Sequence, residues 1–306
     1  MIVIPAAVSA SAAEYALCDR TGLIHSVYRN TVNLSLDGRL IALQAAGSPK
    51  SALSIILPLN TDEMTLLRVS AGGLCGIREG ILTLEPPDTG TAPVRIPLRG
   101  DLLPPECVFP VAVPALSRKD AQDIYKNTLT MLEGADGFAR IFTDSGDKDD
   151  PVLAYAGKVM DNTRSLLGAG ITGSVTEITL GNAAAELRRL IGLGTGLTPS
   201  GDDFLCGVLS ALYAFGIWEG TFAKRLHTEI FQHLEDTNAI SAAFLQSSLQ
   251  GECSEAVRIL FQAHFPLSAE ESEKIRGAFS EIGHSSGTDS LCGICYISKL
   301  LWEELL

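Results

Sequence analysis

The sequence predicts an α+β protein in which a β-rich N-terminal domain precedes a mostly helical C-terminal domain. Two observations predict this class. In residues 1–115, apolar and polar residues alternate in short runs separated by turn residues, which is typical of antiparallel strands. In residues 116–306, apolar residues recur at helical spacing. A chain of 306 residues has the length of two such domains, and we place the boundary after residue 115.

The N-terminal domain is predicted to contain several short strands and two tight turns. The first stretch, MIVIPAAVSASAAEYALC, lacks the positively charged start of a secretory signal, so we expect it to begin the fold. Asp37-Gly38 separates the alternating runs NLSL and RLIAL, and this dipeptide favours a two-residue hairpin turn. The segments 51–59 and 64–70 are predicted strands, and residues 76–84 are predicted to fold about Glu79-Gly80.

The C-terminal domain is predicted to be helical from its first long segment onward. AQDIYKNTLTMLEG (121–134) and PVLAYAGKVMDNTRSLL (151–167) both place apolar residues on one helical face. The same spacing continues through most of 176–306, where glycines mark the breaks between helices.

Composition excludes two classes of partner and favours a reducing compartment. The chain carries 36 acidic and 23 basic residues, a net charge of −13, and no polybasic run, so we expect no nucleic acid partner. Its apolar runs end well before the roughly 18 residues of a membrane helix, so we expect no membrane partner. Seven cysteines, an odd number, favour free thiols in the cytoplasm. Cys292 and Cys295 have CxxC spacing, but no second pair completes a zinc site, so we expect them in the core.

Two segments of the helical domain repeat one motif. SGDDFLCG (200–207) and SGTDSLCG (286–293) are identical at six of eight positions, at a constant separation of 86 residues. In each copy a serine stands three residues before an aspartate and precedes an apolar run, which is the capping-box pattern of a helix N-terminus. We therefore predict that Ser200 and Ser286 cap two helices, with Asp203 and Asp289 as their partners.

The first copy contains more than a helix start requires. Gly192, Gly194 and Gly196 precede it, and Asp202 is a carboxylate that the capping box does not use. The second copy follows His284. A glycine-rich entry to a helix favours anions, because its free amides point outward and the helix dipole attracts negative charge. The segment has neither the lysine of a P-loop nor the spacing of a dinucleotide fingerprint.

The pairing of GLGTGLTPSGDDFLCG with GHSSGTDSLCG resembles a bacterial family of carboxylase-labelled domains of unknown function. That family includes the H subunit of oxamate carbamoyltransferase, an enzyme of allantoin catabolism. The resemblance is dense over residues 190–295 and looser over HSVYRNTVNLSLDGRLIAL. It implies a subunit of a hetero-complex that converts oxalurate and phosphate into oxamate and carbamoyl phosphate.

The resemblance gives each motif residue an expected role. The ligand is expected to be a small anion: phosphate, carbamoyl phosphate, oxamate or oxalurate. Asp202, Asp203 and Asp289 are expected to orient an amide N–H or to hold Mg²⁺, and His284 is the acid–base candidate, since only its ordinary pKa lies near neutrality. The expected anion-binding residues are Gly194, Gly196, Thr198, Ser200, Gly201, Ser286, Gly287 and Thr288.

Several alternatives stay open at this point. The site can belong to a stand-alone Mg²⁺-dependent hydrolase or phosphoryl-transfer enzyme that uses the aspartates. Alternatively, the chain is a non-catalytic assembly subunit whose glycines only shape helix junctions. Arg29, Arg188 and Arg189 are candidate cations for an anionic ligand, and Thr237 and Ser241 are candidates either for lining a pocket or for a cap and a packing contact.

Overall fold

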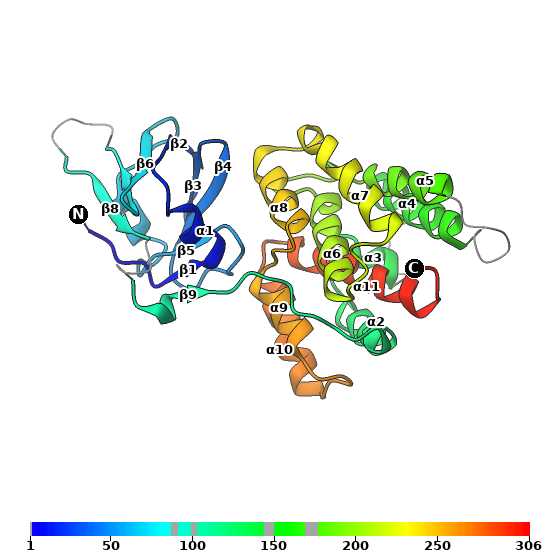
Figure 1. Cartoon of the computed structure of the whole chain (residues 1–306). Coiled ribbons are helices and arrows are strands. Elements are labelled where there is room, and N and C mark those ends of the chain that lie inside the picture. Colours follow the sequence, from blue (N-terminus) through cyan, green and yellow to red (C-terminus); the bar gives the residue numbers. More distant parts are fainter. Residues whose placement is uncertain (1, 87–90, 99–102, 144–149, 169–176) are drawn as a thin grey trace. The chain divides into compact units, whose positions relative to one another are not determined.

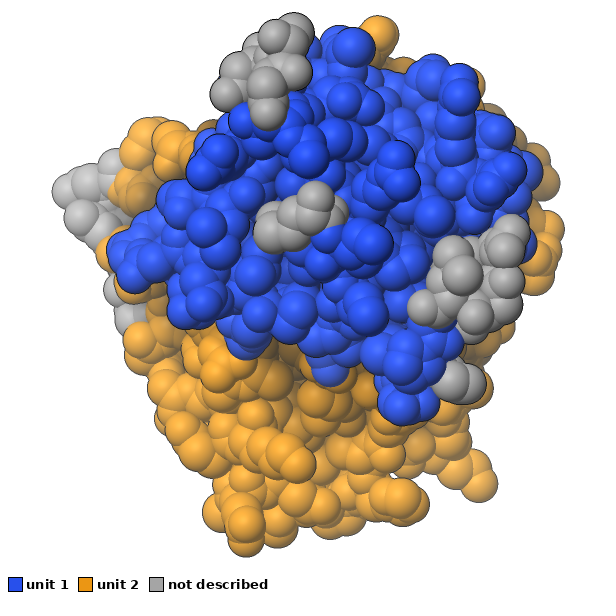
Figure 2. Space-filling model, turned by 90° about the vertical axis from the view of Figure 1, so that its left-hand side faces the viewer, with its two compact units in different colours: residues 1–111 blue, residues 112–306 orange. Residues whose placement is uncertain are grey.

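A computed structural model describes residues 2–86, 91–98, 103–143, 150–168 and 177–306. The chain divides into two compact units, residues 1–111 and 112–306 (Figure 2). The first unit is built on a sheet and the second is helical (Figure 1), which confirms the predicted α+β class.

The described strands of the first unit form one nine-stranded sheet in the order β8-β7-β6-β2-β3-β4-β5-β1-β9. The β4–β5 and β1–β9 pairs are parallel and the other pairs are antiparallel. The strands are β1 Ala7–Ser9, β2 Arg20–Val27, β3 Thr31–Leu36, β4 Arg39–Gln44, β5 Ser54–Ile56, β6 Leu74–Arg78, β7 Ile81–Leu84, β8 Val94–Pro97 and β9 Val108–Phe109. The unit also contains α1 Ala10–Tyr15 and the 3-10 turns η1 Glu63–Leu67 and η2 Pro105–Cys107.

Both predicted turns are confirmed. Asp37 and Gly38 have φ values of 44° and 81° and join β3 to β4. Glu79 and Gly80 have φ values of 51° and 75° and join β6 to β7. Two successive left-handed residues are what a two-residue hairpin turn needs, because they match the twist of the flanking strands. The local sequence is therefore sufficient to predict the position of both hairpin turns.

The predicted strand at 64–70 is wrong, because this segment begins with η1. Asn60 Oδ1 accepts hydrogen bonds from the amides of Asp62 and Glu63, at 3.0 and 2.9 Å, and Glu63 Oε2 accepts one from the Asn60 amide at 2.8 Å. This local capping favours a helical turn over a strand. Met64 and Leu67 are buried three residues apart, a spacing that suits the turn.

The second unit is a helical domain with its own core. Its helices are α2 Ala121–Met131, α3 Ala139–Phe142, α4 Pro151–Gly168, α5 Glu177–Arg188, α6 Ser200–Ala214, α7 Thr221–Gln232, α8 Ala239–Leu249, α9 Glu255–Gln262, α10 Ala269–Ser280 and α11 Ser286–Trp302, with 3-10 turns η3 Arg118–Asp120 and η4 Leu234–Asp236. No helix among the described residues is long and apolar enough to cross a membrane.

Helices α6 and α11 pack directly against each other within this unit (Figure 1). At their crossing a Cβ atom on Gly207 would lie 1.9 Å from the Ser290 carbonyl oxygen. A Cβ atom on Gly293 would lie 2.0 Å from the Phe204 carbonyl oxygen. These four residues form two pairs at equivalent positions of the repeated motif, so the two copies cross each other reciprocally.

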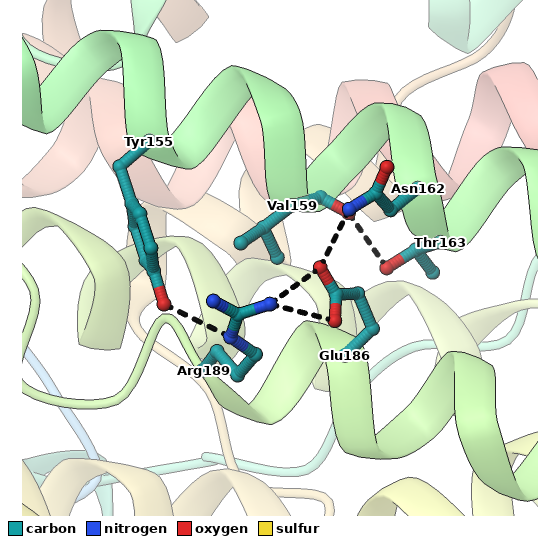
Figure 3. A network of polar contacts seen from close by, with 6 residues as sticks. All are labelled: Tyr155, Val159, Asn162, Thr163, Glu186 and Arg189. Atoms are coloured by element: carbon teal, nitrogen blue, oxygen red, sulfur yellow. Dashed lines mark hydrogen bonds and ion pairs between the residues drawn. The ribbon is translucent and has the colours of Figure 1, made fainter.

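Polar contacts fix the helices that lead into the first motif. Arg189 Nε donates to the Tyr155 hydroxyl at 2.9 Å, and Asn162 Nδ2 donates to Glu186 Oε1 at 2.9 Å (Figure 3). Partial burial raises the pKa of Glu186, but hydrogen bonds from Asn162 and Arg189 outweigh it and hold the pKa below its ordinary value. Arg188 Nε lies 3.3 Å from Oε2 of Glu229 in α7. The end of α5 is thereby tied to α4 and α7 immediately before the glycine loop.

Candidate functional site

The two motif copies meet at the N-termini of α6 and α11. Ser200 and Ser286 are the first helical residues, and the cap positions belong to Pro199 and Ser285, neither of which makes a side-chain capping bond. The predicted capping boxes are therefore wrong. The two copies are joined at this point by the hydroxyls of Thr198 and Ser286, which lie 2.7 Å apart.

Asp289 is fully buried one turn into α11. Its Oδ1 accepts a hydrogen bond from the Phe138 amide at 2.7 Å, whereas its Oδ2 has no hydrogen-bond partner among the described residues. Burial raises the pKa of Asp289 to about 6, against the opposing hydrogen bonds of Phe138, Ser200 and Ser285. This carboxyl consequently keeps its proton to a higher pH than an exposed aspartate does.

Asp203 occupies the equivalent place in α6 and is 8% exposed. Burial raises its pKa well above the ordinary value, hydrogen bonds from Ser286 and Thr198 oppose the shift, and the negative charge of Asp289 adds to it. Its Oδ2 also lacks a partner among the described residues. Two buried carboxyl groups, each with one unsatisfied oxygen, therefore lie at the meeting point of the two helices.

Asp202 differs from its neighbour because hydrogen bonds occupy both of its oxygens. Oδ1 accepts from the Gly192 amide at 2.8 Å, and Oδ2 accepts from the Thr237 hydroxyl at 2.6 Å. Burial raises the pKa of Asp202, while the hydrogen bonds from Thr237 and Gly192 oppose the shift. This side chain anchors the glycine loop to the residues that precede and begin α8.

The loop between α5 and α6 presents free backbone donors. The amides of residues 194–198 donate no hydrogen bond to any described residue. Gly194 and Gly196 have φ values of 125° and 100°, a region that favours glycine. The Thr198 hydroxyl lies 2.7 Å from the Ser286 hydroxyl and joins the loop to α11.

Gly201 and Gly287 are committed to packing. Their amides donate to the carbonyl oxygens of Leu193 and Ile282, at 2.9 and 3.0 Å. A Cβ atom on Gly201 would lie 1.9 Å from the Leu190 carbonyl oxygen, and one on Gly287 would lie 1.8 Å from that of Phe279. Each glycine thus lets the end of the preceding helix approach the start of the next.

His284 is exposed, and no hydrogen bond or ion pair joins it to any described residue. Thr288 is half-buried and donates its hydroxyl proton to the Ser285 carbonyl oxygen at 2.7 Å. The structure therefore brings together Thr198, Ser200, Asp203, Ser286 and Asp289, without a described contact from His284.

Sequence reasoning missed the turn before α3. A Cβ atom on Gly137 would lie 2.4 Å from Asp289 Oδ1, and the next amide, that of Phe138, donates to the same oxygen. The Phe138 ring packs on Phe204 of α6 with ring centroids 5.9 Å apart. The sequence signal for this turn was the pair of glycines in GADGF (134–138). In the structure both glycines have positive φ values.

The three candidate metal ligands do not form one cluster, and the candidate cations pair elsewhere. Within the described part of the chain, no group of three His, Cys, Asp or Glu side chains is placed to hold a metal ion. Cys292 and Cys295 are buried free thiols, as the sequence predicted. Arg188 and Arg189 pair with Glu229 and Glu186, and Arg29 pairs with Asp62 in the other unit.

Fold and site together define an α+β protein whose helical unit joins two copies of a glycine-entry helix over a pair of buried carboxyl groups. Residues 190–298 match the model of the family described as oxamate carbamoyltransferase subunit AllH. This match supports membership of that family, as the two motifs predicted. It spans α6–α11 up to residue 298 and includes both motif copies. No solved structure matches the chain.

Proposed function

We propose that this chain acts in an oxamate carbamoyltransferase complex by binding the small anions of the reaction at the entry to α6. The family match supports a carbamoyltransferase subunit, and a subunit implies other chains beside it. In the proposed reaction a phosphate oxygen attacks the terminal carbamoyl carbon of oxalurate. The bond from that carbon to the oxamate nitrogen breaks, the nitrogen takes a proton, and carbamoyl phosphate and oxamate leave.

The observation that carries this proposal is the row of amides at residues 194–198, which donate no hydrogen bond to any residue that the structure describes. They precede the N-terminus of α6, and the N-terminus of α11 lies beside it through the Thr198–Ser286 contact. Backbone donors at a helix N-terminus bind phosphates and carboxylates. With a net charge of −13, the chain needs such local donors to hold an anion against its overall field.

A thermal-shift experiment on the full chain tests this proposal with inorganic phosphate, oxamate and oxalurate, each with and without Mg²⁺. A ligand of the native state raises the Tm. We expect phosphate, oxamate and oxalurate each to do so, and we expect Gly196→Ala to lose most of the shift because alanine strains the loop at φ 100°.

Gly216→Ala is the matched control, since Gly216 also has a positive φ, of 66°, with open space around it, at the far end of α6. It should keep the full ligand shift. If no anion raises the Tm and loop variants leave the activity of the reconstituted complex intact, the chain is an assembly subunit instead. A shift that depends strictly on Mg²⁺ would favour the hydrolase alternative.

A further inference from the structure

The carboxyl groups of Asp203 and Asp289 form a symmetric pair. They occupy equivalent positions of the two motif copies, one turn into α6 and α11, and the hydroxyls of Thr198 and Ser286, 2.7 Å apart, join the two helix starts. The two helices cross through the equivalent glycines Gly207 and Gly293, so the pairing follows from the repeat itself.

The unsatisfied Oδ2 atoms are the second feature of this pair. Asp289 is fully buried and Asp203 is 8% exposed, yet each keeps one oxygen without a described partner. A buried polar atom without a hydrogen bond costs folding free energy, on the order of 1–3 kcal/mol. Asp202 shows that the same segment can satisfy a buried carboxylate completely, since both of its oxygens are bonded. The open oxygens are therefore suited to a ligand.

The chemistry of the pair limits what that ligand is. Two buried acids that repel each other's charge hold a proton between them more readily than two exposed acids. Such a pair offers one O–H donor and several carboxylate acceptors. A primary amide or carbamoyl group is complementary, because its C=O accepts and its NH₂ donates. A ligand carboxylate at the same point would meet like charge.

We infer that Asp203 and Asp289 together form the recognition site for the carbamoyl or primary-amide end of the ligand. The inference rests on the proposed function, in which the amides of residues 194–198 hold the anionic end. The Thr198–Ser286 contact links the two parts, because Thr198 ends that amide row and both hydroxyls also interact with Asp203. The backbone amides thus bind the anionic end of one small ligand, and the carboxyl pair binds its carbamoyl or primary-amide end.

Oxamate and pyruvate provide a matched pair of probes. They carry the same charge and nearly the same shape, but a methyl group replaces NH₂ in pyruvate. We expect isothermal titration of the full chain to give oxamate a Kd at least about tenfold lower than that of pyruvate, because a site built for N–H donors rejects an analogue without them. Inorganic phosphate serves as the reference for the amide loop.

The variants Asp203→Asn and Asp289→Asn should reduce the oxamate preference to about twofold or less without weakening phosphate binding. Asp161→Asn, an exposed aspartate of α4, is the control and should keep the preference. If the unaltered chain binds phosphate but binds oxamate and pyruvate with equal affinity, the inference is overturned and the proposed function still stands. The comparison of oxamate with pyruvate uses only the unaltered chain, so its result does not depend on whether the variants fold. Absence of binding by both phosphate and oxamate counts against the proposed function and the inference together.

Discussion

Three aspartates within two short motifs have different environments, and those environments separate their roles. Asp202 accepts two hydrogen bonds and ties the glycine loop to Thr237. Asp203 and Asp289 are buried with one open oxygen each. Identical side chains acquire different proton affinities and different tasks through burial and hydrogen bonding. The sequence motif treats the three carboxylates alike, and only the packing of α6 on α11 distinguishes them.

The raised pKa of Asp289 predicts how the free energy of unfolding changes with pH. Folding raises this pKa from about 4 to about 6, so between these pH values the native state holds a proton that the unfolded chain has released. The stability contributed by the protonated group is present below pH 4 and is lost as the pH rises through 6. Asp289→Asn removes this loss and keeps an acceptor for the Phe138 amide. Its stability relative to the unaltered chain should rise by roughly 1 kcal/mol from pH 5 to pH 8.

Urea unfolding at the two pH values measures this difference. Asp161→Asn on the surface of α4 is the control and should show a flat difference. A pH-independent difference for Asp289→Asn would mean that Asp289 does not titrate abnormally in the native state.

The role of Asp202 as an anchor predicts an asymmetry between two substitutions. Asp202→Ala leaves the Gly192 amide and the Thr237 hydroxyl without an acceptor, and should cost about 1–3 kcal/mol of unfolding free energy. Asp202→Asn keeps an oxygen for Gly192 and should cost less than about 1 kcal/mol. Urea unfolding measures both, and hydrogen exchange at Gly192 should accelerate only in the alanine variant. Equal losses in the two variants would refute the anchoring role.

At the scale of elements, the two duplicated helices were predictable, but their partners were not. The apolar stripes after Ser200 and Ser286 predicted α6 and α11 correctly. The capping boxes failed because the cap positions fall on Pro199 and Ser285 and Asp289 accepts from the distant Phe138 amide, a contact that no local pattern contains. The Gly137–Phe138 turn was missed for the same reason, since it lies about 150 residues from Asp289 in the chain. Hairpins at Asp37-Gly38 and Glu79-Gly80 succeeded because their geometry is local.

The crossing of α6 and α11 predicts that its two glycines are sensitive to a single methyl group. Gly207→Ala and Gly293→Ala would place Cβ atoms 1.9 and 2.0 Å from opposing carbonyl oxygens, so each should cost about 1–3 kcal/mol or more through overpacking. Gly181→Ala in α5 has open space and should stabilise the chain by about 0.5–1 kcal/mol. Urea midpoints of the three variants provide the test. A neutral Gly207→Ala would show that the two helices do not approach this closely.

At the scale of the whole molecule, the described residues of each unit form a hydrophobic core of their own. One core includes Leu34, Ile41 and Leu43 of the sheet, and the other includes Phe204, Leu209 and Ile297 of the helical unit. Every residue of the candidate site belongs to residues 112–306, and so does the span that matches the family. The second unit therefore has the features of a domain that folds by itself and that contains the whole proposed ligand site.

This independence predicts the behaviour of residues 112–306 expressed alone. The fragment keeps the buried faces of α6 and α11, the Phe138 contact with Asp289 and the Asp202 anchor, so we expect a helical spectrum and one cooperative urea transition. Its phosphate affinity should lie within about threefold of that of the full chain, because the amides of residues 194–198 and both helix N-termini remain. Circular dichroism and isothermal titration of the fragment beside the full chain measure both properties. A fragment that folds cooperatively but no longer binds phosphate, when the full chain does, would show that residues 1–111 contribute directly to the ligand site.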